Sequence, residues 1–129
     1  MDAAELLRRY ADGERNFQGI DLSGAKLNGV DLRDINLSGA NLSRVDLSDA
    51  NLSGANLSDI SAALWGRMSG ANLSGANLSK ANLSGCEMLG VNLENANTRG
   101  ARLGTLESAF VRNTINPDGV LIEGPMTIE

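Results

Sequence analysis

A five-residue repeat is the feature of this 129-residue chain that most limits its fold. Ala-Asn-Leu-Ser-Gly at 50–54 is followed directly by Ala-Asn-Leu-Ser-Asp at 55–59, and such quintets run without interruption over 15–59 and again over 66–105. The first position of a quintet is small or β-branched, the second mostly Asn or Asp, the third mostly Leu and the fifth mostly Gly. A repeat of this kind is analysed before any single element, because it determines the whole architecture.

A period of five fits neither a continuous helix nor a flat strand. On an α-helix, successive Leu residues would lie about 140° apart and form no apolar stripe. On a strand, an odd period points successive Leu residues to opposite faces. The chain must therefore turn once in every quintet, with positions one and three inside and positions two, four and five outside. Ser-Gly at positions four and five is the turn, because Gly adopts the positive φ of a type II turn without strain.

The third positions are the predicted core, and thirteen of the seventeen are Leu. The core residues that we predict are Leu22, Leu27, Leu32, Leu37, Leu42, Leu47, Leu52, Leu57, Met68, Leu73, Leu78, Leu83, Met88, Leu93 and Leu103. At seven fifth positions another residue replaces Gly, and there we expect a different type of turn. These residues are Asp34, Arg44, Asp49, Asp59, Lys80, Asn95 and Thr105.

In these quintets the chain resembles the pentapeptide-repeat proteins, whose motif is often written A(D/N)LXX. The resemblance covers residues 15–113 and implies an all-β solenoid, the right-handed quadrilateral parallel β-helix, with four quintets in each coil. About five coils, stacked at ~4.8 Å, would form a rod about 24 Å long. A ladder of Leu beside a ladder of Ala, Val and Ile would fill its interior and leave no space for water.

Two irregularities interrupt the repeat. Residues 60–65 are six where five belong, so we infer one inserted residue, a β-bulge in a stacked strand, with Ala62 too small to fill its central position. Residues 106–108 are three where five belong, and we interpret them as the fraying of the last coil.

Trp65, the only Trp of the chain, lies at the predicted bulge with Leu64 and Arg67 close by in the sequence. Our preferred interpretation is that the indole fills the void beside Ala62. The alternative is an interaction site formed by all three residues, because Trp and Arg are favoured at binding hot spots.

The open ends of a solenoid expose strand edges and need caps. For the N-terminal segment 1–14 we predict a capping helix over 3–11, opened by the capping-box pattern of Asp2 and sealing the first coil with Leu7 and Tyr10.

The C-terminal segment 114–129 contains a turn signal, Asn-Pro-Asp-Gly at 116–119, followed by Val-Leu-Ile. We expect this tail to fold across the last coil, or alternatively to offer an edge to a second molecule. A monomer is our expectation, with an end-to-end dimer as the alternative.

Composition excludes several classes of site. The chain has no His and one Cys, so it holds no His-based triad, no His-ligated metal, no internal disulfide and no Cys-cluster zinc site. No apolar run approaches the ~20 residues that span a bilayer. The acidic N-terminus is unlike a signal peptide, so we expect a cytoplasmic protein.

The net charge of −5 comes entirely from the two terminal segments, because residues 15–113 carry nine acids and nine bases. This balance argues against a nucleic-acid-binding stripe. It also argues against DNA mimicry, the mechanism by which some members of the resembled family inhibit a type II topoisomerase.

The remaining candidate sites have simpler structural explanations. Cys86 occupies an inward position as a small apolar residue rather than as a redox thiol. The repeated Asn-Leu-Ser matches the N-glycosylation pattern only because the repeat generates it. Asp46 and Asp49 share a quintet, and on a four-sided coil Arg67 and Glu87 fall on the same face, where we expect ion pairs rather than a metal. Asp31, Arg33 and Asp34 are interpreted in the same way.

The sequence therefore predicts a non-catalytic protein-interaction or scaffold module with an unidentified protein partner. We expect no cofactor, no metal, no small-molecule substrate, no nucleic acid and no membrane. The alternatives are a DNA-mimic inhibitor of a type II topoisomerase and, by family analogy only, a regulator of cell differentiation.

Overall fold

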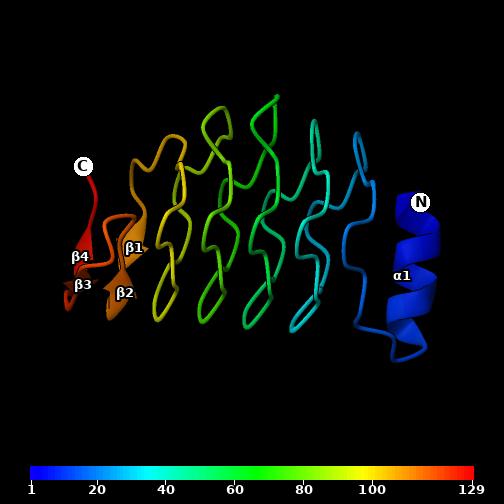
Figure 1. Ribbon diagram of the computed structural model, residues 1–129, viewed down its shortest axis with the longest axis horizontal. Helices are drawn as coiled ribbons and strands as arrows, with labels where there is room; N and C mark the ends of the chain where they lie inside the picture. The colour runs from blue at the N-terminus through cyan, green and yellow to red at the C-terminus, as the bar shows by residue number, and fades with distance from the viewer.

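The computed structural model describes residues 1–129 as a four-sided rod with its two termini at opposite ends (Figure 1). Helix α1 (Ala3–Ala11) lies beside the first coil. At the other end lie four short strands: β1 (Phe110–Val111), β2 (Thr114–Ile115), β3 (Leu121–Ile122) and β4 (Met126–Thr127). Between the two ends the chain winds through coils that are joined by isolated parallel bridges.

The second residues of the quintets carry these bridges. Asn16 pairs with Asn36, and Asp21 pairs with Asn41, so that these bridges join residues 20 positions apart. Twenty residues are four quintets, and the predicted four-sided coil is therefore confirmed.

The hydrogen bonds repeat with the quintet. In the quintet 35–39, the second-residue N–H (Asn36) donates to Arg15 O in the preceding coil, and the third-residue N–H (Leu37) donates to Asn56 O in the next coil. The fifth-residue N–H also reaches the next coil, and the first-residue N–H closes the turn behind it. Four of the five backbone N–H groups are thus satisfied by backbone carbonyls, as a dry rod requires.

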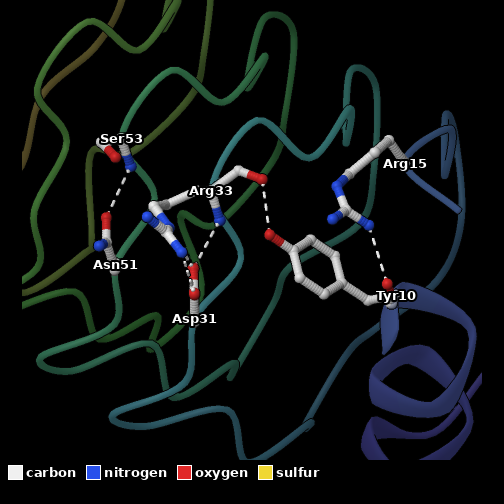
Figure 2. Close-up of polar contacts among 6 residues, drawn as sticks. All are labelled: Tyr10, Arg15, Asp31, Arg33, Asn51 and Ser53. Atoms are coloured by element: carbon white, nitrogen blue, oxygen red, sulfur yellow. Dashed lines mark hydrogen bonds and ion pairs between the residues drawn. The ribbon is translucent and has the colours of Figure 1, made fainter. Parts of the chain in front are cut away.

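The one remaining N–H group, that of the fourth residue, explains why Asn is so frequent at position two. Its side-chain oxygen accepts a hydrogen bond from the N–H of the fourth residue, as Asn51 Oδ1 does from Ser53 at 3.1 Å (Figure 2). The same Asx contact recurs at Asn36, Asn41, Asn56, Asn72, Asn77, Asn82, Asn92 and Asn97. These side chains lie outside, as predicted, but their contact with the turn was not predicted, although Asn is known to accept a hydrogen bond from the backbone two residues later.

The prediction of a different turn at the non-glycine corners is wrong at six of its seven positions, and the seventh residue, Thr105, does not lie at such a corner. Asp34, Arg44, Asp49, Asp59, Lys80 and Asn95 keep φ values between 57° and 61°, in the left-handed region that glycine occupies at the other corners. The stacked hydrogen bonds on both sides of each corner hold the backbone in this conformation, and Asp and Asn tolerate it better than most residues.

The inserted residue lies in a corner turn and not in a stacked strand, so the predicted bulge is wrong. Ser61 bridges to both Asn41 and Asn82, and the ladder of bridges is unbroken there. Arg44 N–H donates to Leu64 O at 2.7 Å, which places Leu64 at position four and leaves Ala63 as the extra residue. A longer turn is tolerated because it projects beyond the ladder; in Figure 1 this green segment reaches furthest from the rod along the upper edge.

The second irregularity is also displaced from its predicted place. Thr105 bridges to Glu87, only 18 residues earlier, so residues 104–108 form a complete quintet. The shortened quintet is 101–103, which has lost both of its turn residues. Gly104 permits this sharp corner, because a Cβ there would lie 1.9 Å from Cys86 O.

The interior follows the predicted ladder. Fourteen of the fifteen predicted core residues are buried, and Leu103 is half-buried. Leu103 borders an apolar hollow of about 200 Å³ between the last coil and the tail. Ala62 is fully buried at its central position.

Helix α1 spans the predicted residues, and Asp2 Oδ1 accepts the N–H of Glu5 at 2.9 Å. Its most buried residue is Leu6, while Leu7 and Tyr10, which we expected to seal the coil, are half-buried against the same core. Leu7 and Tyr10 thus share this contact, and Leu6 makes the larger part of it.

Tyr10 also anchors the helix through polar contacts (Figure 2). Its hydroxyl donates to Arg33 O at 2.7 Å, and its ring lies 3.6 Å from the Arg15 guanidinium carbon. Arg15 Nη1 donates to Tyr10 O at 2.8 Å.

The tail folds back on the last coil. Strand β3 pairs antiparallel with β2, and β4 pairs antiparallel with β1. Ile122 and Ile128 pack against the core from the tail. Val120, Leu121 and Met126 remain exposed.

Candidate interaction surface

One side of the rod differs from the others in its second-position residues. The bridges stack these residues in four columns, and three columns contain mostly Asn or Asp. The fourth column, which we call the charged face, consists of Lys26, Asp46, Arg67 and Glu87 in four successive coils. Charges of opposite sign therefore alternate along it, one charge per coil.

The electrostatics of the charged face are visible at Asp46. Its carboxylate accepts hydrogen bonds from the Ser48 hydroxyl at 2.7 Å and the Ser48 N–H at 3.0 Å, and these contacts are the main reason that the pKa of Asp46 is lowered. Arg67 and Lys26 lower this pKa further from the two neighbouring coils. The expectation of ion pairs on this face is wrong, because all ion pairs of the structure lie elsewhere. Arg67 stands between the carboxylates of Asp46 and Glu87, and the structure contains no group of three or more potential metal-ligating side chains.

The turn at Ala63, Leu64 and Trp65, which we call the Trp65 corner, borders the charged face. Leu64 is 63% exposed and Trp65 is 76% exposed. The interpretation that the indole fills a void beside Ala62 is therefore wrong. Trp65 stands at the fifth position with φ of 60°, and the side chain at this position points out of the rod at every corner.

The backbone around this corner is also unusual. The N–H groups of Trp65 and Gly85 make no hydrogen bond within the protein, whereas most fifth residues donate to the next coil. Gly85 lies above the corner, and a Cβ there would come within 1.9 Å of Ala63 O. The absence of a side chain at Gly85 lets the longer turn fit beneath the next coil.

Two shallow hollows flank the indole. One, of about 270 Å³, is lined by Trp65, Gly66, Arg67, Gly85 and Glu87. The other, of about 250 Å³, is lined by Ala63, Leu64, Trp65 and Gly85. The structure thus joins the three residues of the predicted interaction site, Leu64, Trp65 and Arg67, into one surface with the charged face.

Two exposed residues on the margins of this surface were not singled out as site residues by the sequence analysis. Leu89 is 44% exposed at the opposite edge of the charged face. Arg44 is exposed at the corner directly below Trp65, one coil earlier. Only knowledge of which quintets share a side could have marked them.

The other candidate residues have structural roles. Cys86 is a buried free thiol, and burial, together with the neighbouring Glu87, raises its pKa to about 12. Asp31 and Arg33 form an ion pair at 2.9 Å on a different side of the rod (Figure 2). The only helix, α1, has nine residues and is not long enough to cross a membrane.

Comparison with known proteins places the chain among its relatives. The family described as Pentapeptide repeats matches residues 16–54 and 67–104, in eight copies. A pentapeptide-repeat protein from the thylakoid lumen of Arabidopsis thaliana is 31% identical over 77% of this chain and 70% of its own, with a TM-score of 0.55. A second, from Nostoc, is 35% identical over 87% and 82% of the two chains, with a TM-score of 0.44.

A third solved structure is HetL, a Nostoc protein involved in the regulation of heterocyst differentiation. It is 22% identical over 95% of this chain and all of its own, with a TM-score of 0.33. Among curated proteins none shows significant similarity to the chain. The family match covers more than half of the residues, and the quintets, the four-sided coils and the stacked Leu core agree with it: the chain belongs to the pentapeptide-repeat family and has its right-handed quadrilateral β-helix.

Proposed function

We propose that this protein is a non-catalytic protein-binding module whose contact surface is the Trp65 corner together with the charged face. The observation that carries the proposal is the exposure of the only Trp, 76% of whose surface faces solvent. Trp is the residue most characteristic of binding hot spots, where its large surface is buried against a partner. Leu64 beside it and Arg67, two residues later on the charged face, supply further apolar and charged contacts.

The rod suits such a role because it holds this surface rigidly. The bridges continue unbroken beneath the corner, from Asn41 through Ser61 to Asn82 and from Asp46 through Arg67 to Glu87. A preformed surface loses little conformational entropy on binding, which favours affinity.

The charged face argues against DNA mimicry. Imitation of a duplex requires a continuous run of negative charge, whereas here basic and acidic residues alternate from Lys26 to Glu87. We therefore expect no inhibition when an excess of the protein is added to a gyrase supercoiling assay, and inhibition at low micromolar protein would contradict the proposal. No residue of the chain favours a role in cell differentiation in particular.

The proposal includes the cytoplasmic location that the sequence analysis predicts. Fractionation of cells that produce the tagged protein tests this part separately.

The main test compares partner capture by the wild type, Trp65→Ser and Lys80→Glu. Lys80 also occupies a left-handed corner but faces away from the proposed surface, so Lys80→Glu is the matched control. We expect partners from cell extract to bind the wild type and the control and to be lost with Trp65→Ser. Titration of the purified partner should then show binding weakened by about 2 kcal/mol, roughly thirtyfold. Equal capture by all three proteins would place the contact surface elsewhere.

A further inference from the structure

The charged face is complementary to itself, and we propose that the partner bound there is a second copy of this chain, packed side against side in antiparallel orientation. This inference rests on the proposed function, because it names the partner of the same surface. Its evidence is the order of charges along the rod together with the position of the Trp65 corner.

The order of charges selects one orientation. From the first coil to the fourth it is positive at Lys26, negative at Asp46, positive at Arg67 and negative at Glu87. A second rod that runs in the opposite direction presents the reverse order. Lys26 then faces Glu87 of the other copy, and Asp46 faces Arg67, each pair occurring twice. A parallel arrangement would instead place all four residues against like charges, which is destabilising.

The geometry allows all four pairs to form together. Both copies have the same coil spacing, ~4.8 Å, so that centring one pair of coils aligns the others. The two-fold axis lies between the two charged faces, at right angles to the rods and level with the gap between the coils of Asp46 and Arg67. Such a closed, isologous contact uses the same residues from both copies.

The same symmetry gives the exposed indole a partner. The axis runs parallel to the charged face and across the rods, so each edge of the face meets the same edge in the second copy. Because the rods are antiparallel, the third coil of one copy meets the second coil of the other. The Trp65 corner of one copy therefore lies opposite the corner that carries Arg44 in the other. An Arg guanidinium over a Trp face is a favourable cation–π pair, and the symmetry forms it twice. The hollow between Trp65, Arg67 and Glu87 leaves room for this side chain and offers it a carboxylate.

The contact is limited to one side of a small rod. Stable interfaces bury about 800 Å² per partner, and four coils of one side offer less than this. We therefore expect a weak dimer that forms at high micromolar concentration. Because its pairs are charged and near solvent, its dissociation constant should rise with salt.

The test is sedimentation equilibrium of the full chain with two charge reversals, Lys26→Glu and Glu87→Lys. Each variant alone places like charges at two of the four pairs, so its dissociation constant should rise about tenfold or more. An equimolar mixture of the two restores every pair, because Glu at 26 in one chain meets Lys at 87 in the other. We expect the mixture to dimerise like the wild type. Lys80→Glu, a charge reversal on another side, should dimerise like the wild type alone.

The mixing experiment distinguishes the proposed dimer from a role of the four charges within a single chain. If the charges served only to stabilise neighbouring coils, mixing two defective chains would restore nothing, and that result would overturn the antiparallel dimer. Trp65→Ala and Arg44→Ala should each weaken dimerisation, and the double variant should weaken it no more than the stronger single one.

A wild type that stays monomeric up to about 1 mM would overturn self-association. Capture of a different partner that is lost with Trp65→Ser would then leave the proposed function standing. A monomer without any Trp65-dependent partner would overturn both proposals.

Discussion

The charged face and the Asn column of Asp31, Asn51, Asn72 and Asn92 share one backbone but use position two differently. On the Asn column the side chain turns back and accepts the N–H of its own turn, as Asn72 does from Ser74 at 3.0 Å. Lys26 and Arg67 have no acceptor, so their side chains project from the rod and their turn N–H groups are left to solvent or to other partners. The Asn column is thus committed to its own fold, whereas the charged face remains available for contacts.

Asp46 combines both roles. It accepts the N–H and the hydroxyl of Ser48, as Asn would, and it also faces the positive charges of Arg67 and Lys26. The irregular corners lie along one edge of this same side: the inserted Ala63, the small Gly85 and the shortened corner at Gly104. Departures from the repeat are therefore concentrated where the surface is least committed to the fold.

The largest expected effect is on folding, and we expect it to be the same in the interior behind each of the two sides. Leu47 lies behind the charged face and Leu52 behind the Asn column, and both are fully buried. Leu47→Asp and Leu52→Asp each bury an unpaired carboxylate among stacked Leu residues, so both should prevent folding. Circular dichroism and thermal melting measure this. If one of the two variants folded and the other did not, the interiors behind the two sides would not be equivalent.

The next effect belongs to the inner edge of the charged face, where Cys86 occupies a first position. Its thiol stays protonated in the folded protein up to a pKa of about 12, while in the unfolded chain it ionises near its ordinary value of 9.0. The folded state therefore binds the proton more tightly, and its contribution to stability is lost as the pH rises above 9.0. The loss should approach 1.4 kcal/mol per pH unit.

Urea unfolding at pH 8, 9 and 10 measures this loss for the wild type and Cys86→Ala. The decline that the thiol causes should be absent from Cys86→Ala. In the folded wild type the thiol should also resist a thiol reagent at pH 8. Equal slopes for the two proteins would show that Cys86 is not desolvated.

A smaller effect separates the outer surfaces of the two sides. Asn72→Ala removes the acceptor of a partly buried turn N–H and should cost about 1 kcal/mol of unfolding free energy. Arg67→Ala removes no such acceptor and should change stability by less than about 0.5 kcal/mol. Urea denaturation midpoints of both variants give the comparison directly. An equal loss in both would mean that the Asx contact does not distinguish the two sides.

Much of the fold could be predicted because every quintet carries the same pattern of inward, outward and turn residues. A single Leu at a third position would be ambiguous, but seventeen quintets in register fix the inside, the outside and the turn. The capping helix was predictable for a different reason: Asp2 and the spacing of Leu6, Leu7 and Tyr10 are local signals that need no knowledge of the rod.

The sequence could not reveal where the exceptions lie in space. An extra residue between Ser61 and Gly66 is compatible with a bulge in the strand or with a longer turn, and only the stacking of Ser61 on Asn41 and Asn82 decides between them. The missing residues near Thr105 were assigned to the wrong quintet because Gly104 and Thr105 can be assigned to either of two quintets. Each exception depends on the neighbouring coils, which lie about 20 residues away in the chain.

The smallest expected effect on stability is at Trp65, where the Trp65 corner should behave as an outer surface. The indole is 76% exposed and fills no cavity, so Trp65→Ala should change the unfolding free energy by less than about 1 kcal/mol. The left-handed φ of 60° at this position disfavours Trp and Ala alike, so the substitution does not change the cost of the backbone conformation. Leu64→Ala, at the neighbouring exposed position, is the matched control and should be similarly neutral. In the wild type at low micromolar concentration, the Trp fluorescence should be red-shifted and readily quenched by acrylamide. A loss of 3 kcal/mol or more with Trp65→Ala would require a buried indole, because only a cavity costs that much.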